Sequence, residues 1–142
     1  MKMNNRLIRI MLILLTVITL VGVVALVVIL NLNDDPNAEP TIDEVLEATV
    51  DIEEITTNLY SNDYIKISFK IQTSSKKAKE ELEKRNFQVK DIIIKELSEM
   101  KAEDLKGKEG KHHLEEMIRS KVNSIMQEGT VEKVYITSLI IQ

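Results

Sequence analysis

The sequence contains no cysteine and no tryptophan, and it has three tyrosines and two phenylalanines in 142 residues. Without cysteine the chain forms no disulfide, no thiolate nucleophile and no cysteine-based metal site. So few aromatic side chains argue against stacking on the bases of a nucleic acid. The net charge of −4 also lacks the basic excess that binding to phosphates requires. We therefore expect no nucleic-acid partner.

Charged residues are absent from Ile10 to Leu30, a run of twenty-one residues broken only by two threonines and a glycine. As a helix this run is roughly 30 Å long, which matches the hydrocarbon core of a bilayer. It is longer than the apolar region of a signal peptide, which is about 7–15 residues, and no small-x-small cleavage motif follows it. We predict an uncleaved transmembrane helix over residues 10–32, in contact with membrane lipid.

Basic and acidic residues are distributed unevenly around this run. Residues 1–33 hold three bases and no acid, residues 34–54 hold nine acids and no base, and the remainder is nearly balanced. Basic residues flank the cytoplasmic end of membrane helices. Residues 1–9 are therefore predicted to be cytoplasmic, and the domain after the single span is predicted to lie outside the cell membrane.

The predicted span contains no Asp, Glu, His, Lys or Arg. Since proton and ion paths through membranes need such groups, the helix is expected to anchor the chain and pack against other helices, not to carry ions. Small side chains permit close approach between helices. The candidate partner contacts are Thr16, Thr19, Gly22 and Ala25. The alternative is that these small residues are scattered and have no partner.

Residues 33–54 are predicted to form an acidic linker and a juxtamembrane helix. Pro36 and Pro40 prevent a continuous helix, and Thr41 with Glu44 fits a capping box that starts a short one. The apolar residues on one side of this helix form a candidate collar against neighbouring copies. These collar residues are Ile42, Val45 and Leu46. A loosely ordered acidic stalk is the alternative interpretation.

Strand patterns are found at both ends of residues 55–142. Ile55–Tyr60 and Tyr64–Gln72 are predicted to form a hairpin, because apolar residues alternate with polar ones along the second of these strands. The last segment, residues 131–142, is rich in β-branched and aliphatic side chains. We predict that it joins the sheet in its interior or at a protected edge, since an unpaired strand of this kind aggregates.

Helical patterns begin after the hairpin. One helix is predicted over Lys76–Arg85, and a second over Phe87–Met100. The second helix contains three consecutive isoleucines and is predicted to lie centrally on the sheet. Its inward residues are expected to include Phe87, Ile94 and Leu97.

Two further helical segments complete the domain. Ala102–Leu105 is predicted to form one turn, and an amphipathic helix carries apolar residues from Leu114 to Met126. Gly110 precedes this helix, and Gly129 is the expected C′ residue after it. The order of elements predicts an α+β fold, with an antiparallel sheet covered by helices over residues 55–142.

Residues 107–116, GKEGKHHLEE, contain two glycines, two lysines and both histidines of the chain. The stretch lacks the spacing of a P-loop and does not follow a strand. It also lacks the H-E-x-x-H zinc motif, and His112 or His113 with Glu116 supplies only two ligands. We interpret it as a turn and a first helical turn. With no base beside a nucleophile in the pattern, we expect no catalytic, cofactor-binding or metal-binding residue and no small-molecule substrate.

Several short motifs stand in a fixed order along the chain. They are Ile67–Ile71, Gln88 with Asp91–Ile93, Asp104–Leu105 before GKEGK, Gly110–Leu114, Asn123, and Val134–Thr137 through Gln142. Together with the single span, they resemble the FliL family of flagellar basal-body-associated proteins over nearly the whole chain. One departure is that Ile136 and Leu139 stand where the family often has phenylalanine.

The resemblance implies a domain of the stomatin/prohibitin (SPFH) type that assembles into a homo-oligomeric ring. It also implies association with the flagellar stator proteins and the basal body, support of motor rotation, motility and swarming, and no enzymatic activity. The alternative is a membrane-anchored extracytoplasmic module unrelated to motility, which binds a ligand or lipid in an apolar pocket between the hairpin and the Phe87–Met100 helix.

Overall fold

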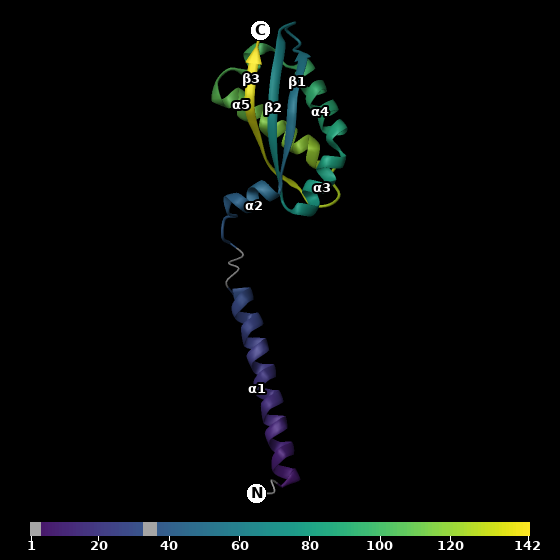
Figure 1. Cartoon of the computed structure of the whole chain (residues 1–142). Coiled ribbons are helices and arrows are strands. Elements are labelled where there is room, and N and C mark those ends of the chain that lie inside the picture. Colours follow the sequence, from purple (N-terminus) through teal and green to yellow (C-terminus); the bar gives the residue numbers. More distant parts are fainter. Residues whose placement is uncertain (1–3, 33–36) are drawn as a thin grey trace. The chain divides into compact units, whose positions relative to one another are not determined.

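A computed structural model of the chain describes residues 4–32 and 37–142. These residues form two units, which meet in sequence between Glu39 and Pro40. The first unit contains the helix α1 (Asn5–Leu32), and the second contains all the other helices and strands (Figure 1). The predicted cytoplasmic base Lys2 and the first linker residues, 33–36, lie outside the described residues.

The second unit is built around a three-stranded antiparallel sheet in the order β1-β2-β3. Its strands are β1 (Thr49–Asn58), β2 (Tyr64–Thr73) and β3 (Val131–Ile141). Its helices are α2 (Ile42–Glu47), α3 (Lys76–Lys84), α4 (Asn86–Glu99), the 3₁₀ turn η1 (Ala102–Leu105) and α5 (Gly107–Asn123). The predicted α+β fold and the predicted order of elements are therefore confirmed.

One face of the sheet and two long helices form the core. Alternate residues of β2 point into it and are fully buried, as the sequence pattern predicts for a sheet covered on one side. Helices α4 and α5 each contribute side chains spaced four residues apart, which face the sheet. The two inner rows are Val89, Ile93 and Leu97, and Leu114, Ile118 and Val122. Each such side chain contributes about 1.5–3 kcal/mol when it is fully buried.

Strand β1 begins at Thr49, six residues before the predicted start at Ile55. Its pairing with β2 shifts between Ile52 and Ile55, so that Glu53 and Glu54 occupy an irregularity in the strand. Such a bulge breaks the alternation of apolar and polar residues. The first half of β1 therefore looked like acidic linker in the sequence.

Helix α4 lies on the sheet over the edge strand β1 and not centrally as predicted, because α5 covers the side of β3. Two of its three expected inward residues point outward. Phe87 is 72% exposed and Ile94 is 40% exposed, whereas Leu97 is buried. The buried row that contains Leu97 runs through Val89 and Ile93, and it lies on the opposite side of the helix from Phe87. Because three consecutive isoleucines point in different directions around the helix, the sequence did not determine which side of α4 faces the core.

Helix α5 begins and ends earlier than predicted. It starts at Gly107, so Gly110 lies inside the helix, and it ends at Asn123 with Ser124 as its C-cap. A Cβ at Gly110 would overlap the Asp104 carbonyl oxygen, so the missing side chain lets α5 approach η1 closely. Gly129 has a φ of 97° and belongs to the turn before β3, not to the end of the helix.

Strand β3 forms one edge of the sheet, and side chains of α5 cover part of that edge. The Val131 N–H donates to Asn123 Oδ1 over 2.6 Å, and the Asn123 amide donates back to the Val131 carbonyl over 3.0 Å. Farther along, the Ile136 N–H donates to Glu115 Oε1 over 3.1 Å. The predicted protected edge is therefore confirmed for the final strand.

Candidate functional site

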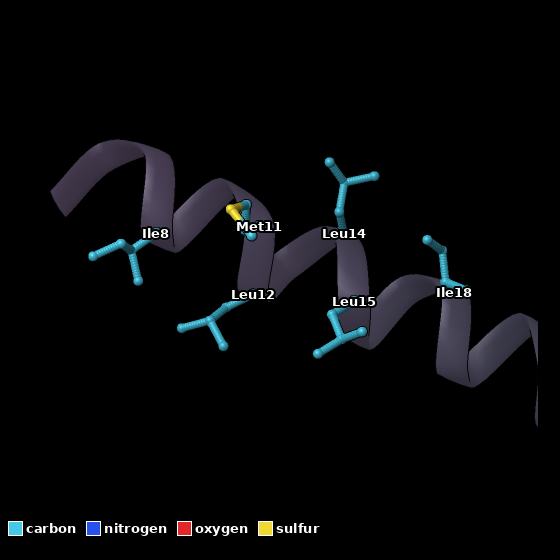
Figure 2. A pocket seen from close by; sticks show the side chains of 6 residues that line it. All are labelled: Ile8, Met11, Leu12, Leu14, Leu15 and Ile18. Atoms are coloured by element: carbon cyan, nitrogen blue, oxygen red, sulfur yellow. The ribbon is translucent and has the colours of Figure 1, made fainter. Parts of the chain in front are cut away.

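Helix α1 is apolar on every side and has no buried residue. It is long and apolar enough to cross a membrane. Figure 2 shows part of this surface, where apolar side chains line a groove of about 410 Å³. They belong to Ile8, Met11, Leu12, Leu14, Leu15 and Ile18. A helix of this kind needs lipid or other helices around it.

The small residues of α1 offer room for close contact but no free polar group that requires a partner. The hydroxyl groups of Thr16 and Thr19 donate to the carbonyls of Ile13 and Leu15 within the helix, each over 2.8 Å. A Cβ added at Gly22 would meet no atom within 4 Å. Residues three apart form a row that winds around a helix axis at about 45°. A straight neighbouring helix would therefore contact only part of the set Thr16, Thr19, Gly22 and Ala25. The role of these four residues in helix contact stays a prediction.

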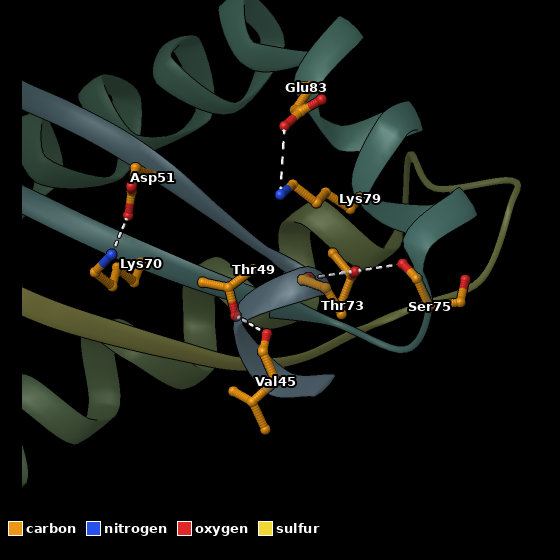
Figure 3. Close-up of polar contacts among 9 residues, drawn as sticks. Val45, Thr49, Asp51, Lys70, Thr73, Ser75, Lys79 and Glu83 are labelled. Carbon is orange, nitrogen blue, oxygen red and sulfur yellow. Dashed lines mark hydrogen bonds and ion pairs between the residues drawn. The ribbon is translucent and has the colours of Figure 1, made fainter. Parts of the chain in front are cut away.

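Helix α2 starts with the capping box that the sequence predicts. The Glu44 N–H donates to Thr41 Oγ1 over 3.3 Å, and the Thr41 N–H donates to Glu44 Oε2 over 2.7 Å. The other end of α2 is bonded to the sheet, since the Thr49 hydroxyl donates to the Val45 carbonyl over 2.5 Å (Figure 3). These bonds hold a helix that is too short to be stable alone.

The three candidate collar residues differ in exposure. Ile42 is 70% exposed and Leu46 is 54% exposed, while Val45 is half-buried. Because Ile42 and Leu46 are four residues apart, they lie side by side on the helix. Helix α2 also carries three acids and no base. It therefore presents an apolar pair within an acidic surface.

The two histidines of α5 lie on its wet face, as the sequence predicts. Both side chains are exposed, and His112 Nδ1 is 3.8 Å from Glu115 Oε2. The hydrogen bond from Arg119 holds the pKa of Glu116 below its usual value, because the effect of this bond is larger than the opposing effect of burial. Within residues 4–32 and 37–142, no three His, Asp or Glu side chains are placed to hold a metal ion. The arrangement is that of a solvated helix start.

A second surface, which the sequence analysis did not identify, lies where α3 meets α4. We call it the α3–α4 groove, and it measures about 480 Å³. Its lining holds three bases, three acids, two glutamines and one aromatic ring: Lys77, Lys84, Arg85, Glu80, Glu81, Glu128, Gln88, Gln127 and Phe87. The six bases and three acids of residues 76–90 gave no signal for this surface, because the lining itself holds three of each. The surface was not predicted because Phe87 was expected to face the core.

Glu81 fixes the shape of the α3–α4 groove. Its carboxylate accepts hydrogen bonds from Arg85 Nε over 2.7 Å and from the backbone N–H groups of Gln127 and Glu128 over 3.0 and 2.6 Å. Burial alone would raise the pKa of Glu81, but the bonds from Arg85 and the two N–H groups together hold it below its usual value. The charged carboxylate thus ties the turn before β3 to α3.

Comparison with known proteins places these features in one family. The family model described as "Flagellar basal body-associated protein FliL" matches residues 49–142. "Flagellar protein FliL" of Bacillus subtilis (strain 168) is 50% identical over 105 residues, which cover 74% of this chain and 75% of that protein. "Flagellar protein FliL" of Aquifex aeolicus (strain VF5) is 28% identical over 79 residues, covering 56% of this chain and 49% of that protein. The chain therefore belongs to the FliL family of flagellar basal-body-associated proteins.

Proposed function

We propose that this protein is an anchored structural partner of the flagellar motor, which assembles beside or around the stator units and supports rotation, motility and swarming. In this proposal the N-terminus is cytoplasmic, and the domain after the span lies outside the cell membrane. The domains stand side by side in a ring, as expected for a domain of the stomatin/prohibitin type. Membership of the FliL family supports the flagellar setting.

The observation that carries this proposal is apolar surface that the chain does not cover by itself. All the apolar side chains of α1 are exposed, and the span from Ile10 to Leu30 has no ionisable residue. Such a helix anchors and packs but provides no ion path. It suits a protein that stands next to an ion-conducting partner and does not itself conduct.

Helix α2 supports the assembly of several copies. It follows the span closely in sequence and exposes the apolar pair Ile42 and Leu46. Copies anchored in one membrane meet at a high effective concentration, so a small contact surface is enough to hold them together. A collar of α2 helices therefore forms more readily on the membrane than it would in solution.

The structure gives no specific support to the alternative of a ligand-binding module. The space between β1 and α4 is filled by core side chains, among them Ile52, Ile55, Val89 and Ile93. Protein interiors packed in this way leave little room for a ligand. We therefore do not propose a pocket between the hairpin and α4.

Crosslinking in living cells tests the proposed function. Single cysteines are placed in the full chain at positions from 10 to 50, which contain no native cysteine. We expect self-crosslinks from Ile42→Cys and Leu46→Cys, and crosslinks to stator helices that recur about every 3.6 residues along α1. A deletion strain should lose swarming and torque under load. Normal torque, with a protein that does not co-localise with motors, would refute the proposal.

A further inference from the structure

We propose that helix α2 is an extensible element, which unfolds and refolds while the sheet stays intact and so adjusts the length of chain between the membrane helix and the domain. Residues 41–49 are called the α2 segment below. The inference concerns a single copy of the chain. It goes beyond the proposed role at the motor, because it holds whether or not copies assemble there.

The hydrogen bonds that give the α2 segment its helical form are local. At one end Thr41 and Glu44 form the capping box, and at the other the Thr49 hydroxyl donates to the Val45 carbonyl. Between them, the Val45 N–H donates to the Thr41 carbonyl over 2.9 Å, and the Ala48 N–H donates to the Glu44 carbonyl over 3.2 Å. Each of these bonds joins residues three or four apart, so they can break together without disturbing the sheet.

Side-chain packing adds little to these local bonds. Helix α2 contains no buried residue: Ile42 and Leu46 are exposed, and Val45 is half-buried. By contrast, α4 and α5 each bury three side chains in the core. A six-residue helix has few hydrogen bonds to offset the cost of its nucleation. Because segments with few buried contacts open far more easily than the whole domain unfolds, α2 opens on its own.

Thr73 marks the point at which this opening stops. Its N–H donates to the Ala48 carbonyl over 2.9 Å, and its hydroxyl oxygen lies 2.6 Å from the same carbonyl oxygen. Thr73 is only 2% exposed, so water has little access to these bonds. They continue the pairing of β1 with β2, in which Thr49 lies opposite Gln72 (Figure 3). The boundary between the opening helix and the stable sheet therefore lies at Ala48.

Opening lengthens the connection by an amount that the geometry of the backbone sets. The six residues of α2 span about 9 Å as a helix and up to about 20 Å when extended, a gain of roughly 10 Å. Helix α2 carries three acids and no base, and like charges along an opened segment favour the extended form. A surface that covers Ile42 and Leu46, such as the collar proposed above, shifts the equilibrium back to the helix.

Hydrogen exchange of the full chain in vesicles of phosphatidylcholine and phosphatidylglycerol tests the local opening. We expect the amides of Val45 and Ala48 to exchange much faster than those of the central strand β2. Thr41→Ala removes the capping box and should speed the exchange of these two amides by about five-fold. Glu47→Lys places a base in the last turn, four residues after Asp43, and should slow it by roughly two- to five-fold. Neither change should affect β2.

Two threonines of β1 provide a matched pair of variants. Thr49→Val keeps the branched shape but removes the hydroxyl that bonds to the Val45 carbonyl, so it should also speed exchange in α2. Thr57→Val makes the same change at a half-buried position near the far end of the strand and should leave α2 unaffected. Equal effects of the two variants, or α2 amides as protected as those of β2, would overturn the inference.

Energy transfer in the same vesicles tests the change in length. A donor dye on Lys133→Cys, an exposed position of β3 in a chain without native cysteine, reports its separation from acceptor-labelled lipid headgroups. Thr41→Ala combined with Thr49→Val should lower the transfer efficiency, and Glu47→Lys should raise it. Unchanged transfer in variants whose exchange rates change would refute the extensible role. Neither readout depends on stator contacts, so the outcome is separate from the test of the proposed function.

Discussion

Helix α1 and the domain that follows it use the same aliphatic residues in opposite ways. In α1 every Leu, Ile and Val is exposed, whereas Ile65, Ile67 and Ile71 of β2 are completely buried. The domain supplies its own partners from α4 and α5, but α1 must find them outside the chain. The comparison teaches that a continuous apolar surface needs either the rest of the chain or other molecules to cover it. Within the domain, Ile42 and Leu46 of α2 form a small exposed apolar pair, whereas single exposed side chains such as Ile94 and Ile140 are ordinary surface.

The largest effect is expected from charges placed in the middle of α1. Val21→Arg combined with Val24→Arg should release the protein from the membrane, because each arginine opposes insertion at the span centre by about 2.5–3.5 kcal/mol. Carbonate extraction of membranes measures the released fraction. Val21→Leu with Val24→Leu is the control and should stay in the membrane. Full retention of the double arginine variant would mean that lipid does not surround this part of α1.

Two neighbouring isoleucines of α4 give the sharpest test of the boundary between core and surface. Ile93 is fully buried, and Ile94 is 40% exposed. Ile93→Ala should destabilise residues 40–142 by about 2–5 kcal/mol, the usual cost of truncating a core side chain. Ile94→Ala should change stability by no more than about 0.5 kcal/mol. Urea unfolding measures both, and equal losses would contradict the orientation of α4.

Two glycines, one in each region, differ in what surrounds them. Gly110→Ala would bring a Cβ into the Asp104 carbonyl oxygen, so η1 has to move away from α5. We expect a loss of about 1–3 kcal/mol in the free energy of unfolding, typical of overpacking. Gly22→Ala is the counterpart in α1, where an added Cβ meets no atom of the chain within 4 Å, and it should leave membrane anchoring unchanged. A Gly110→Ala domain as stable as the parent would contradict the close approach of the two helices.

The smallest expected effect depends on pH. Since the folded domain holds the pKa of Glu81 below its usual value near 4.5, the stabilisation is present above that value and is lost as pH falls through the lower, folded pKa. Glu81→Gln should lower Tm at neutral pH, and the gap to the parent should narrow in acid. Thermal unfolding from about pH 7 to about pH 3 measures this gap. Glu80→Gln, at an exposed position of α3, is the control, and a gap independent of pH would contradict the role of Glu81.

Much of the fold could be predicted because it depends on periodicity. The alternation along β2 and the capping box of Thr41 and Glu44 each reflect a local rule, and the structure confirms them. The amphipathic pattern of α5 was informative in the same way, although its first turn contains two glycines that usually argue against a helix. In the first turn of α5, the close contact with η1 outweighs the low helix propensity of the two glycines.

Other features could not be predicted because tertiary contacts decide them. The bulge at Glu53 and Glu54 breaks the pattern of β1, so its true start was not visible in the sequence. The consecutive isoleucines of α4 fit more than one helical phase, and packing selected the phase that exposes Phe87. The α3–α4 groove therefore became apparent only in three dimensions, whereas the exposed pair on α2 followed from local pattern.

The side chains that cover the outer edge of β3 have a consequence for a crowded membrane. Asn123 and Glu115 already occupy main-chain groups of Val131 and Ile136, so a strand of a neighbouring copy cannot pair with β3 at these two positions without breaking those bonds. Amyloid-like fusion of adjacent copies is thereby disfavoured. In the proposed assembly, contacts between copies would fall to side chains, which separate and rejoin without unfolding either domain, so that one subunit could be exchanged while the others stay in place.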